Sequence, residues 1–467
     1  MKNTKEIEIH ISDRRFAKNV YRKRKKQRKR HKTHVRFLKN KKLYDPEFTY
    51  ENALLEWLPP NIDYILACDK SIFSFEKLQW NVPNNKGIFK VPRDFSLIDN
   101  PKASYKFIQE LLAALLTQKY SDVRIDYSRC QRVDLGAQVF LDIILKDVLA
   151  FFKRCSRSPF IKTKVRNMTG INVRNDDIRK LLFSVGSPAI HNNQTIRYAD
   201  IIPYPLCIHD RESKKDIVKI IEQKDIDTTN LVDYVLDSLN RLGKSLSPEK
   251  IDDLCTVIGE ILINAEEHST TKYRFSIGYF HEKNENANHY GVFRLVIMNF
   301  GNTIYEKFKD PNCPNKDIVE KMKALSSVYA KRGFWDIGNF EEETLWTLYA
   351  LQEGVTSVAP SDYKKRGNGS IQFIDSFFNL KGESPEKEEN SRLTILSGNA
   401  YISFDGEYTI KEKVIGEDHF KLMTFNRSNN IEDKPDAKYV KFVGNYFPGT
   451  IISAKIIFKE EELTTNA

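Results

Sequence analysis

Two polar residues one helical turn apart are the clearest candidates for chemistry in this chain. The stretch IGEILINAEEHST, residues 258–270, places Glu260 four residues before Asn264, and His268 follows after four more. Four residues advance an α-helix by about 400°, so these side chains form a polar stripe beside an apolar face. A carboxylate there can orient or deprotonate an attacking water, and an amide oxygen suits a hard cation such as Mg²⁺. The alternative is an ordinary exposed helix surface, and we assign His268 no catalytic role.

The stripe requires a helix and a sheet to position it. Ser247 and Pro248 are typical of an N-cap and a first turn, so a helix is expected to begin there and to run past His268. Its expected buried side consists of Leu254, Val257, Ile258, Ile261, Leu262 and Ala265. Two strands are predicted next, at 272–280 and 291–301, and the second ends in a glycine turn at Gly301.

A glycine turn later in the chain has the composition of a phosphate site. In KKRGNGSIQFIDSFF, residues 364–378, the turn opens a predicted helix. Gly367 and Gly369 allow backbone amides to approach a phosphate at the helix start. The residues just before them supply positive charge; they are Lys364, Lys365 and Arg366. A glycine pair of this kind is also common in purely structural turns.

The order of these motifs resembles the GHKL family of ATP-binding domains, the Bergerat fold of gyrase, heat-shock chaperones, mismatch-repair proteins and sensor kinases. EILINAEEH is similar to the N-box, most closely to that of anti-sigma-factor serine kinases, and EGVTS with KKRGNGSI is similar to the phosphate lid. The resemblance covers about 215–460. It implies an α/β sandwich that binds ATP and Mg²⁺, with Glu260 as general base and Asn264 as the Mg²⁺ ligand.

One motif departs from the family pattern. MNFGNTI stands where the family has D-x-G-x-G, so the adenine-reading aspartate is replaced by Asn299 and the second glycine by Thr303. The amide oxygen can still accept a hydrogen bond, but the loss of charge assistance costs on the order of 1 kcal/mol. FWDIGNF offers a rival motif at Asp336 and Gly338, but no buried strand leads into it. We therefore assign the adenine contact to Asn299 and Gly301.

The preceding region has a βαβα pattern. GIFKVP and DVRIDYS are predicted strands, NPKASYKFIQELLAALLTQ a helix with Asn100 near its start, and DLGAQVFLDIILKDVLAFFKR a second helix. With Asp126, Ser128 and Asp134, this order resembles a STAS domain, the fold of anti-sigma-factor antagonists. Those antagonists carry a phosphorylatable serine just after the second aspartate, where this chain has leucine and glycine. A βαβ scaffold without STAS ancestry is the alternative.

The N-terminus carries all of the excess positive charge. Residues 1–42 hold 18 Lys and Arg against 3 Asp and Glu, which leaves 56 against 60 for the rest of the chain. Such an arm is expected to be disordered when free and to bind nucleic-acid phosphates without reading sequence. The residues proposed for this contact are Arg22, Lys23, Arg24, Lys25, Lys26, Arg28, Lys29 and Arg30. The alternative is a solvated tail with no specific partner.

The spacing of the cysteines and the hydropathy of the chain indicate the cellular compartment of the protein. The six cysteines are scattered, with no C-x-x-C pair, and are expected to be reduced thiols. No stretch approaches the roughly 18 apolar residues of a membrane span, and the N-terminus lacks an apolar leader. We expect a cytoplasmic protein that does not enter membranes.

The predicted fold class is α/β and α+β, in four parts. They are a basic arm at 1–45, a helical and connecting segment at 46–87 whose first helix stops at Pro59 and Pro60, a STAS-like domain at 88–208, and a GHKL domain at 215–467 with its lid and insertion at about 305–366. Within the last, LTILSGNAYISFDGEYTI is expected to form a hairpin.

The expected function is a slowly hydrolysing, ATP-dependent regulator. Mg²⁺ and ATP would close the lid and switch an interaction with a protein or nucleic-acid partner, and a homo-oligomer is possible. Bacterial signalling or anti-phage defence is a setting suggested by the resemblance alone. A protein serine kinase of the anti-sigma type and a non-hydrolysing nucleotide sensor or scaffold remain open as alternatives.

Overall fold

The chain divides into two compact units in the computed structural model. The smaller unit comprises the residues up to Pro59 together with Val148–Lys164, and the larger comprises Pro60–Asp147 and Val165–Ala467. The residues that the structure describes are 48–78, 80, 82, 84–158, 160–187, 198–210, 217–241, 243–267, 271, 273–285, 288–329, 340–357, 369–381, 390–415, 418–458 and 463–465.

The smaller unit packs around one tryptophan. Helix α2 (Tyr50–Glu56) begins with a capping box in which the Thr49 side chain accepts a hydrogen bond from the Asn52 amide. The Trp57 ring stacks on Phe48 at 4.5 Å between centroids, and the Arg154 guanidinium lies over it at 5.3 Å. This unit also contains the C-terminal part of helix α5.

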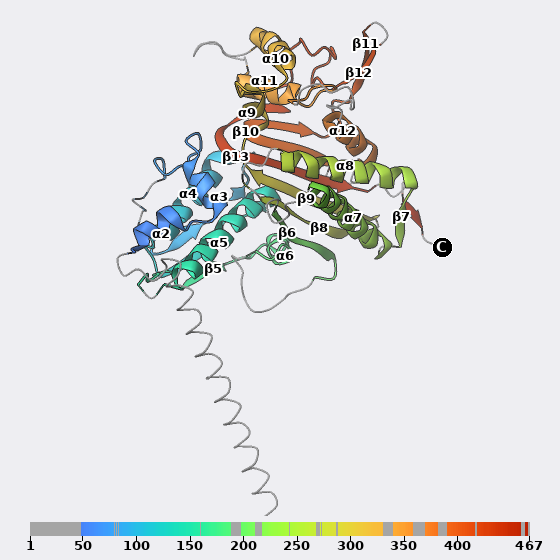
Figure 1. The fold of residues 1–467 in the computed structure, drawn as a ribbon. Helices are drawn as coiled ribbons and strands as arrows, with labels where there is room; N and C mark the ends of the chain where they lie inside the picture. Colours follow the sequence, from blue (N-terminus) through green and yellow to red (C-terminus); the bar gives the residue numbers. More distant parts are fainter. Residues whose placement is uncertain are drawn as a thin grey trace, which may run out of the picture. The chain divides into compact units, whose positions relative to one another are not determined.

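The first layer of the larger unit is built from parallel strands and long helices (Figure 1). Its three-stranded sheet has the order β1-β3-β5, and β2 pairs with β4, all parallel. The elements are α3 (Pro60–Ala67), β1 (Ile88–Lys90), β2 (Asp94–Phe95), α4 (Pro101–Leu116), β3 (Asp122–Asp126), β4 (Arg132–Val133), α5 (Leu135–Cys155), β5 (Asn167–Ile171) and α6 (Asp176–Ser184). The predicted βαβα order is therefore present, and the mixed α/β class is confirmed.

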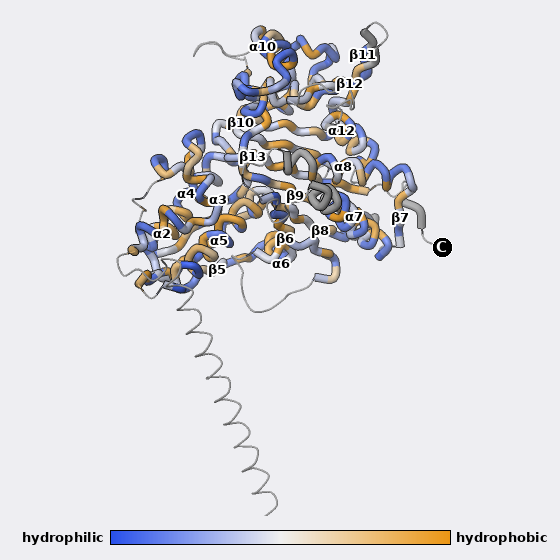
Figure 2. The backbone as a smooth tube through the Cα atoms, viewed as in Figure 1, coloured by the Kyte–Doolittle hydropathy of each residue, from blue (hydrophilic) through white to orange (hydrophobic). Residues whose placement is uncertain are grey.

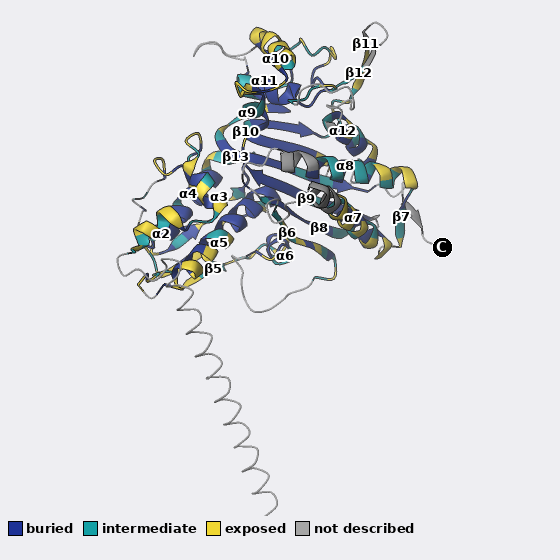
Figure 3. Ribbon diagram, in the orientation of Figure 1, coloured by how far each residue is buried: buried dark blue, intermediate teal, exposed yellow. Residues whose placement is uncertain are grey.

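The second layer is a five-stranded sheet of order β10-β13-β9-β8-β6 in which every pair is antiparallel. Its strands are β6 (Ile201–Asp210), β8 (Tyr273–Glu285), β9 (Asn288–Phe300), β10 (Arg392–Phe404) and β13 (Val440–Ile457). Helices α7 (Ile217–Arg241), α8 (Pro248–Glu267) and α12 (Gly369–Leu380) cover one face (Figure 1). The strands are buried along most of their length (Figure 3), and hydrophobic residues are concentrated there (Figure 2).

The remaining elements lie at the edges of this sheet. They are β7 (Lys244–Leu246), α9 (Ile304–Lys309), α10 (Lys316–Tyr329), α11 (Glu342–Tyr349), β11 (Lys411–Ile415), β12 (Asp418–Leu422) and β14 (Leu463–Thr465). Helices α9, α10 and α11 lie in the described part of the predicted insertion. Among the described residues, none of the helices is both long and apolar enough to cross a membrane.

Helix α8 begins where the sequence predicted. The Lys250 amide donates to the Ser247 hydroxyl at 3.4 Å, which satisfies one of the unpaired donors of the first turn. Five of the expected core residues are at most 1% exposed: Leu254, Val257, Ile258, Ile261 and Leu262. The side chain of Ala265 lies outside the described residues.

Helix α2 ends at Glu56, before the two prolines, as expected, and Pro60 then opens α3, because proline lacks only a donor that the first turn leaves unpaired anyway. Two other expectations about secondary structure are wrong. The boundary after residue 208 falls inside β6, whose residues pair with β8 of the five-stranded sheet. LTILSGNAYISF is not a hairpin but the single strand β10, which pairs with β13 and bends at a bulge around Gly398, where φ is +61°.

Candidate functional site

The candidate site lies where β9 ends. Asn299 is 0% exposed, and its strand neighbours are Arg274 on β8 and Thr450 on β13. Side chains alternate along a strand, so Asn299 shares a face with Leu295 and Ile297. Those two residues belong to the core that includes the buried side of α8. The predicted adenine contact is thus located on the helix-covered face of the sheet.

Polar atoms at this position are buried without partners. Within the described part of the chain, neither the amide oxygen nor the amide nitrogen of Asn299 has a hydrogen-bond partner, and the same holds for Nε of Arg274. Each such atom costs about 1–3 kcal/mol of desolvation free energy. The two residues are direct neighbours across β8 and β9. The fold therefore keeps donors and an acceptor close together that its own described groups do not satisfy.

The guanidinium of Arg274 holds two helices against the sheet. Its Nη2 donates to Oδ2 of Asp227 on α7 at 2.5 Å, and its Nη1 donates to the backbone oxygen of Leu262 on α8 at 3.4 Å. Asp227 also lies 3.4 Å from Nδ1 of His209 on β6. Arg274 is 3% exposed, so these contacts lie in the interior. They bring the second half of α8 next to the end of β9.

A chain of hydroxyl groups continues on the other side of Asn299. The hydroxyls of Thr450 and Ser397 lie 2.9 Å apart, and the Ser397 hydroxyl accepts a hydrogen bond from the Ile304 amide at 2.9 Å. Ile304 is the first residue of α9. The end of β9 is therefore connected through β13 and β10 to the start of the insertion.

Two glycines and one threonine shape the turn after β9. Gly301 has φ +154°, and Gly449 on β13 has φ +150°. A Cβ on Gly449 would lie 2.1 Å from the backbone oxygen of Asn299, so only glycine fits this close approach. Thr303 caps α9: its hydroxyl accepts from the Glu306 amide at 3.1 Å. A threonine at this position therefore has a local structural reason.

Helices α8 and α12, which carry Glu260 and the predicted phosphate-site residue Gly369, pack against each other. Glu260 is half-buried on α8, and Asn264 lies one turn further along. The side chain of Asn379, near the end of α12, donates to Asp253 near the start of α8 at 3.3 Å. Because these contacts join the end of one helix to the start of the other, the helices run antiparallel. Gly369, at the start of α12, is therefore directed toward the half of α8 that carries Glu260.

Several predicted site residues lie outside the described part of the chain. They are Lys364, Lys365, Arg366 and Gly367 of the phosphate turn, the rival pair Asp336 and Gly338, His268, and Arg22, Lys23, Arg24, Lys25, Lys26, Arg28, Lys29 and Arg30 of the arm. The side chain of Asn264 is also outside it, so the predicted Mg²⁺ contact stays a prediction. Among the described residues, no group of three or more His, Cys, Asp or Glu side chains could hold a metal ion.

Sequence reasoning missed four residues of this site. Asp227 and Arg274 are 47 positions apart, and Ser397 and Thr450 are 53 apart. Neither pair has a local motif that identifies it. One signal was available: arginine is unusual in an otherwise apolar alternating strand, and Arg274 interrupts YRFSIGYF on its helix-facing side.

Comparisons with known proteins name no relative. No family model matches the chain, and neither a curated protein nor a solved structure gives a match. The site must therefore be interpreted from its own geometry.

Proposed function

We propose that the protein binds ATP at the end of β9, with the adenine base against Asn299. The observation that carries this proposal is the buried amide of Asn299, whose oxygen and nitrogen both lack partners among the residues that the structure describes. An adenine edge presents an amino donor beside a ring-nitrogen acceptor, and an asparagine amide pairs with both at once. The base would satisfy the atoms that the described fold leaves unpaired.

Glu260 is the proposed general base for slow hydrolysis. The antiparallel packing of α8 and α12 supports this role, because it directs the start of α12 toward the half of α8 that bears the carboxylate. Phosphates placed at the start of α12 would meet backbone amides and the positive end of the helix dipole. Mg²⁺, held by Asn264 and the phosphates, would neutralise charge on the transferred group.

A regulatory signal can leave the site through α9. Glu306 accepts hydrogen bonds from Lys70 at 2.5 Å, from the Thr303 amide at 2.8 Å and from the Tyr446 hydroxyl at 2.7 Å. Burial would raise the pKa of Glu306, but these hydrogen bonds outweigh it and hold the pKa below its usual value. The carboxylate therefore joins the turn after β9 to the segment before β1. Ordering of the insertion by ATP would act on this junction.

Incubation with radiolabelled ATP tests the proposed activity. Free labelled phosphate supports hydrolysis, label on the protein or on a candidate partner supports the serine-kinase alternative, and bound but unconverted ATP supports the sensor alternative. Absence of binding at saturating Mg²⁺ and ATP overturns all three.

The basic arm supports a second, separate proposal, which is a nucleic-acid partner bound through phosphates. Its charge implies affinity that is similar for unrelated duplexes and falls with salt, with a log–log slope of roughly 0.9 per phosphate neutralised. Deletion of residues 1–42 should flatten this slope and leave ATP binding intact. Affinity unchanged by the deletion, or no binding by the intact chain at low salt, would reject it.

A further inference from the structure

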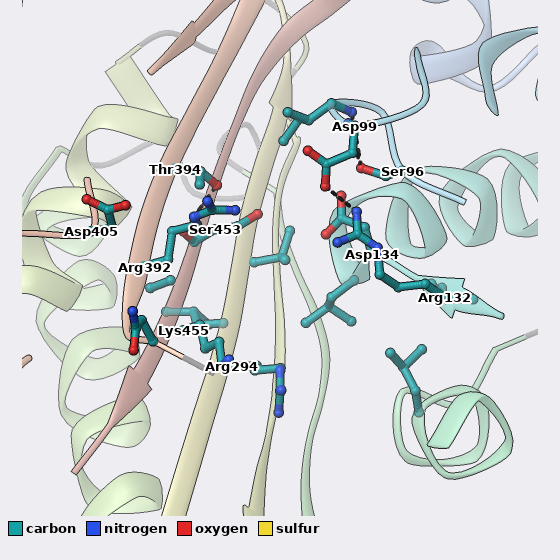
Figure 4. A pocket seen from close by; sticks show the side chains of 18 of the residues that line it. Ser96, Asp99, Arg132, Asp134, Arg294, Arg392, Thr394, Asp405, Ser453 and Lys455 are labelled. Atoms are coloured by element: carbon teal, nitrogen blue, oxygen red, sulfur yellow. Dashed lines mark hydrogen bonds and ion pairs between the residues drawn. The ribbon is translucent and has the colours of Figure 1, made fainter. Parts of the chain in front are cut away.

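The sheet face opposite α8 borders a cavity of about 580 Å³, within the size range of small-molecule sites (Figure 4). One wall is formed by strands β8, β9, β13 and β10. The other is formed by the residues before α4, strand β4 and the start of α5. All of these elements belong to the larger unit. The cavity lies on the other face of β9 from Asn299, because Arg294, which lines it, is five residues away on the alternate face.

Three basic side chains form a row across this wall, which we call the basic row: Arg392, Lys455 and Arg294. Arg392 on β10 pairs in register with Lys455 on β13, and Lys455 pairs with Arg294 on β9. Directly opposed residues have Cβ atoms about 4.5–5.5 Å apart, and like charges in such pairs destabilise a sheet. An anionic group in front of the row would be attracted by all three positive charges.

The neighbouring side chains suit a phosphate further. Thr394 and Ser453 form the next register pair and line the same cavity. The Thr394 hydroxyl donates to the Ser453 backbone oxygen at 3.4 Å, and the Ser453 hydroxyl adds a donor beside the basic row. The Arg294 guanidinium lies 5.5 Å from the centre of the Tyr279 ring on β8. This cation–π contact stabilises the guanidinium against the ring.

The opposite wall carries carboxylates. Asp134 and Asp99 lie there together with Arg132 (Figure 4), and Asp99 forms an ion pair with Arg132 on its own wall. Asp134 stands just before α5, where it accepts a hydrogen bond from the Gly136 amide at 3.3 Å. Burial raises the pKa of Asp134 to about 6, so at neutral pH its carboxylate is mostly ionised and accepts hydrogen bonds. A ligand with amino groups at one end and phosphate at the other matches both walls.

We propose that this cavity binds a phosphorylated small molecule of nucleotide size, with its phosphate against the basic row and its amino-bearing base toward Asp99 and Asp134. This site is separate from the proposed ATP site and would serve as a regulatory input. Strand β9 connects the two, because it carries Asn299 on one face and Arg294 on the other.

The acidic stretch of the chain next to the cavity is the rival occupant. Glu383, Glu386, Glu388 and Glu389 precede Asn390, which lines the cavity. These glutamates lie outside the described residues, so the experiment must separate the two occupants.

Calorimetric titration of the full chain with inorganic pyrophosphate at low salt tests the anionic half of the proposal. Arg392→Gln should weaken binding roughly tenfold or more, as for loss of a charge-assisted hydrogen bond. Arg392 is exposed at its end of β10, so this variant should fold. Arg124→Gln, which removes one exposed strand arginine outside the cavity, should bind as the wild type does. Lys365→Gln, in the predicted phosphate turn, should remove only pyrophosphate binding at that turn and leave the Arg392-dependent binding unchanged.

Four results would overturn the proposal. The first is that the wild type does not bind pyrophosphate, and the second is that Arg392→Gln and Arg124→Gln lose equal pyrophosphate affinity. The third is that Lys365→Gln loses affinity but Arg392→Gln does not. The fourth is that binding appears only after Glu386, Glu388 and Glu389 are replaced by glutamine. The last result would assign the cavity to the acidic stretch.

The base-recognition half is tested in the Asn299→Leu background, where the proposed ATP site is disabled. At least one of AMP, GMP and CMP should bind more tightly than ribose 5-phosphate. Equal affinity for all four would remove the nucleotide assignment. The basic row is not part of the proposed ATP site. If the protein does not bind ATP, the pyrophosphate and nucleotide titrations therefore still test the cavity.

Discussion

Two regions of the larger unit bury a side-chain amide completely, and they treat it in opposite ways. Gln138 on α5 and Asn299 on β9 are both 0% exposed. The Gln138 oxygen accepts from the Tyr127 hydroxyl at 3.2 Å, and its nitrogen donates to Asp142 at 2.9 Å and to Ser187 at 3.3 Å. The oxygen and nitrogen of Asn299 have no partner among the described residues.

The amide of Gln138 stabilises the fold through its hydrogen bonds, whereas the amide of Asn299 destabilises it. A satisfied buried network fixes one arrangement of its elements, because every alternative leaves a donor or acceptor unpaired. An unsatisfied amide costs stability and persists where something outside the fold requires it. The α5 network is therefore structural, and the end of β9 is the proposed binding site.

The largest expected effect is in the α5 network. Gln138→Leu has a similar volume but leaves the Tyr127 hydroxyl without its acceptor and Asp142 without one donor, so the free energy of unfolding should fall by about 2–4 kcal/mol. Thermal unfolding of the ligand-free protein measures this. A melting temperature equal to that of the wild type would contradict the claim that the α5 network stabilises the fold.

The next effect tests the proposed catalytic role of Glu260. Glu260→Gln should lower ATP turnover by roughly 10²-fold or more while leaving nucleotide affinity nearly unchanged, because the amide keeps the size of the side chain but cannot act as a base. Glu249→Gln, in the first turn of the same helix, is the matched control and should retain wild-type turnover. Wild-type turnover in Glu260→Gln would contradict the assignment and favour the sensor alternative.

A smaller effect depends on pH. Burial raises the pKa of Asp142 to about 7, although hydrogen bonds from Ser187 and Gln138 oppose the rise. Between about pH 4 and 7 the folded protein therefore holds a proton that the unfolded chain has released. The stability that this group contributes is present below pH 4 and is lost as pH rises through 7.

Asp142→Asn keeps the accepting oxygen and cannot ionise, so it isolates this group. The wild type should lose stability relative to the variant when melting temperatures are compared at pH 5 and pH 8. A constant difference between the two proteins would show that Asp142 does not titrate in this range.

Patterns local in sequence could be predicted, and contacts between distant strands could not. The start of α8 followed from Ser247 and Pro248, and its buried side followed from apolar residues at helical spacing. The basic row depends on the register of three strands whose residues lie far apart along the chain. No local pattern specifies that register.

Two misses have specific causes. Helix α7 was not predicted because its apolar stripe, which includes Leu231, Val235 and Leu239, is surrounded by polar and charged residues that obscure the period. Asn299 was assigned to the site from the order of the motifs alone. That its amide is unpaired depends on neighbours from β8 and β13, which no single stretch of sequence supplies.

The melting temperature of Asn299→Leu, with and without Mg²⁺ and ATP, tests the central claim most directly. Leucine removes the two atoms that have no partner in the described part of the chain, so the ligand-free variant should be as stable as the wild type or more stable, by up to about 2 kcal/mol. Saturating Mg²⁺ and ATP should raise the melting temperature of the wild type but not that of the variant. A ligand-free variant that melts well below the wild type, or one that keeps the full ATP-dependent shift, would contradict the account.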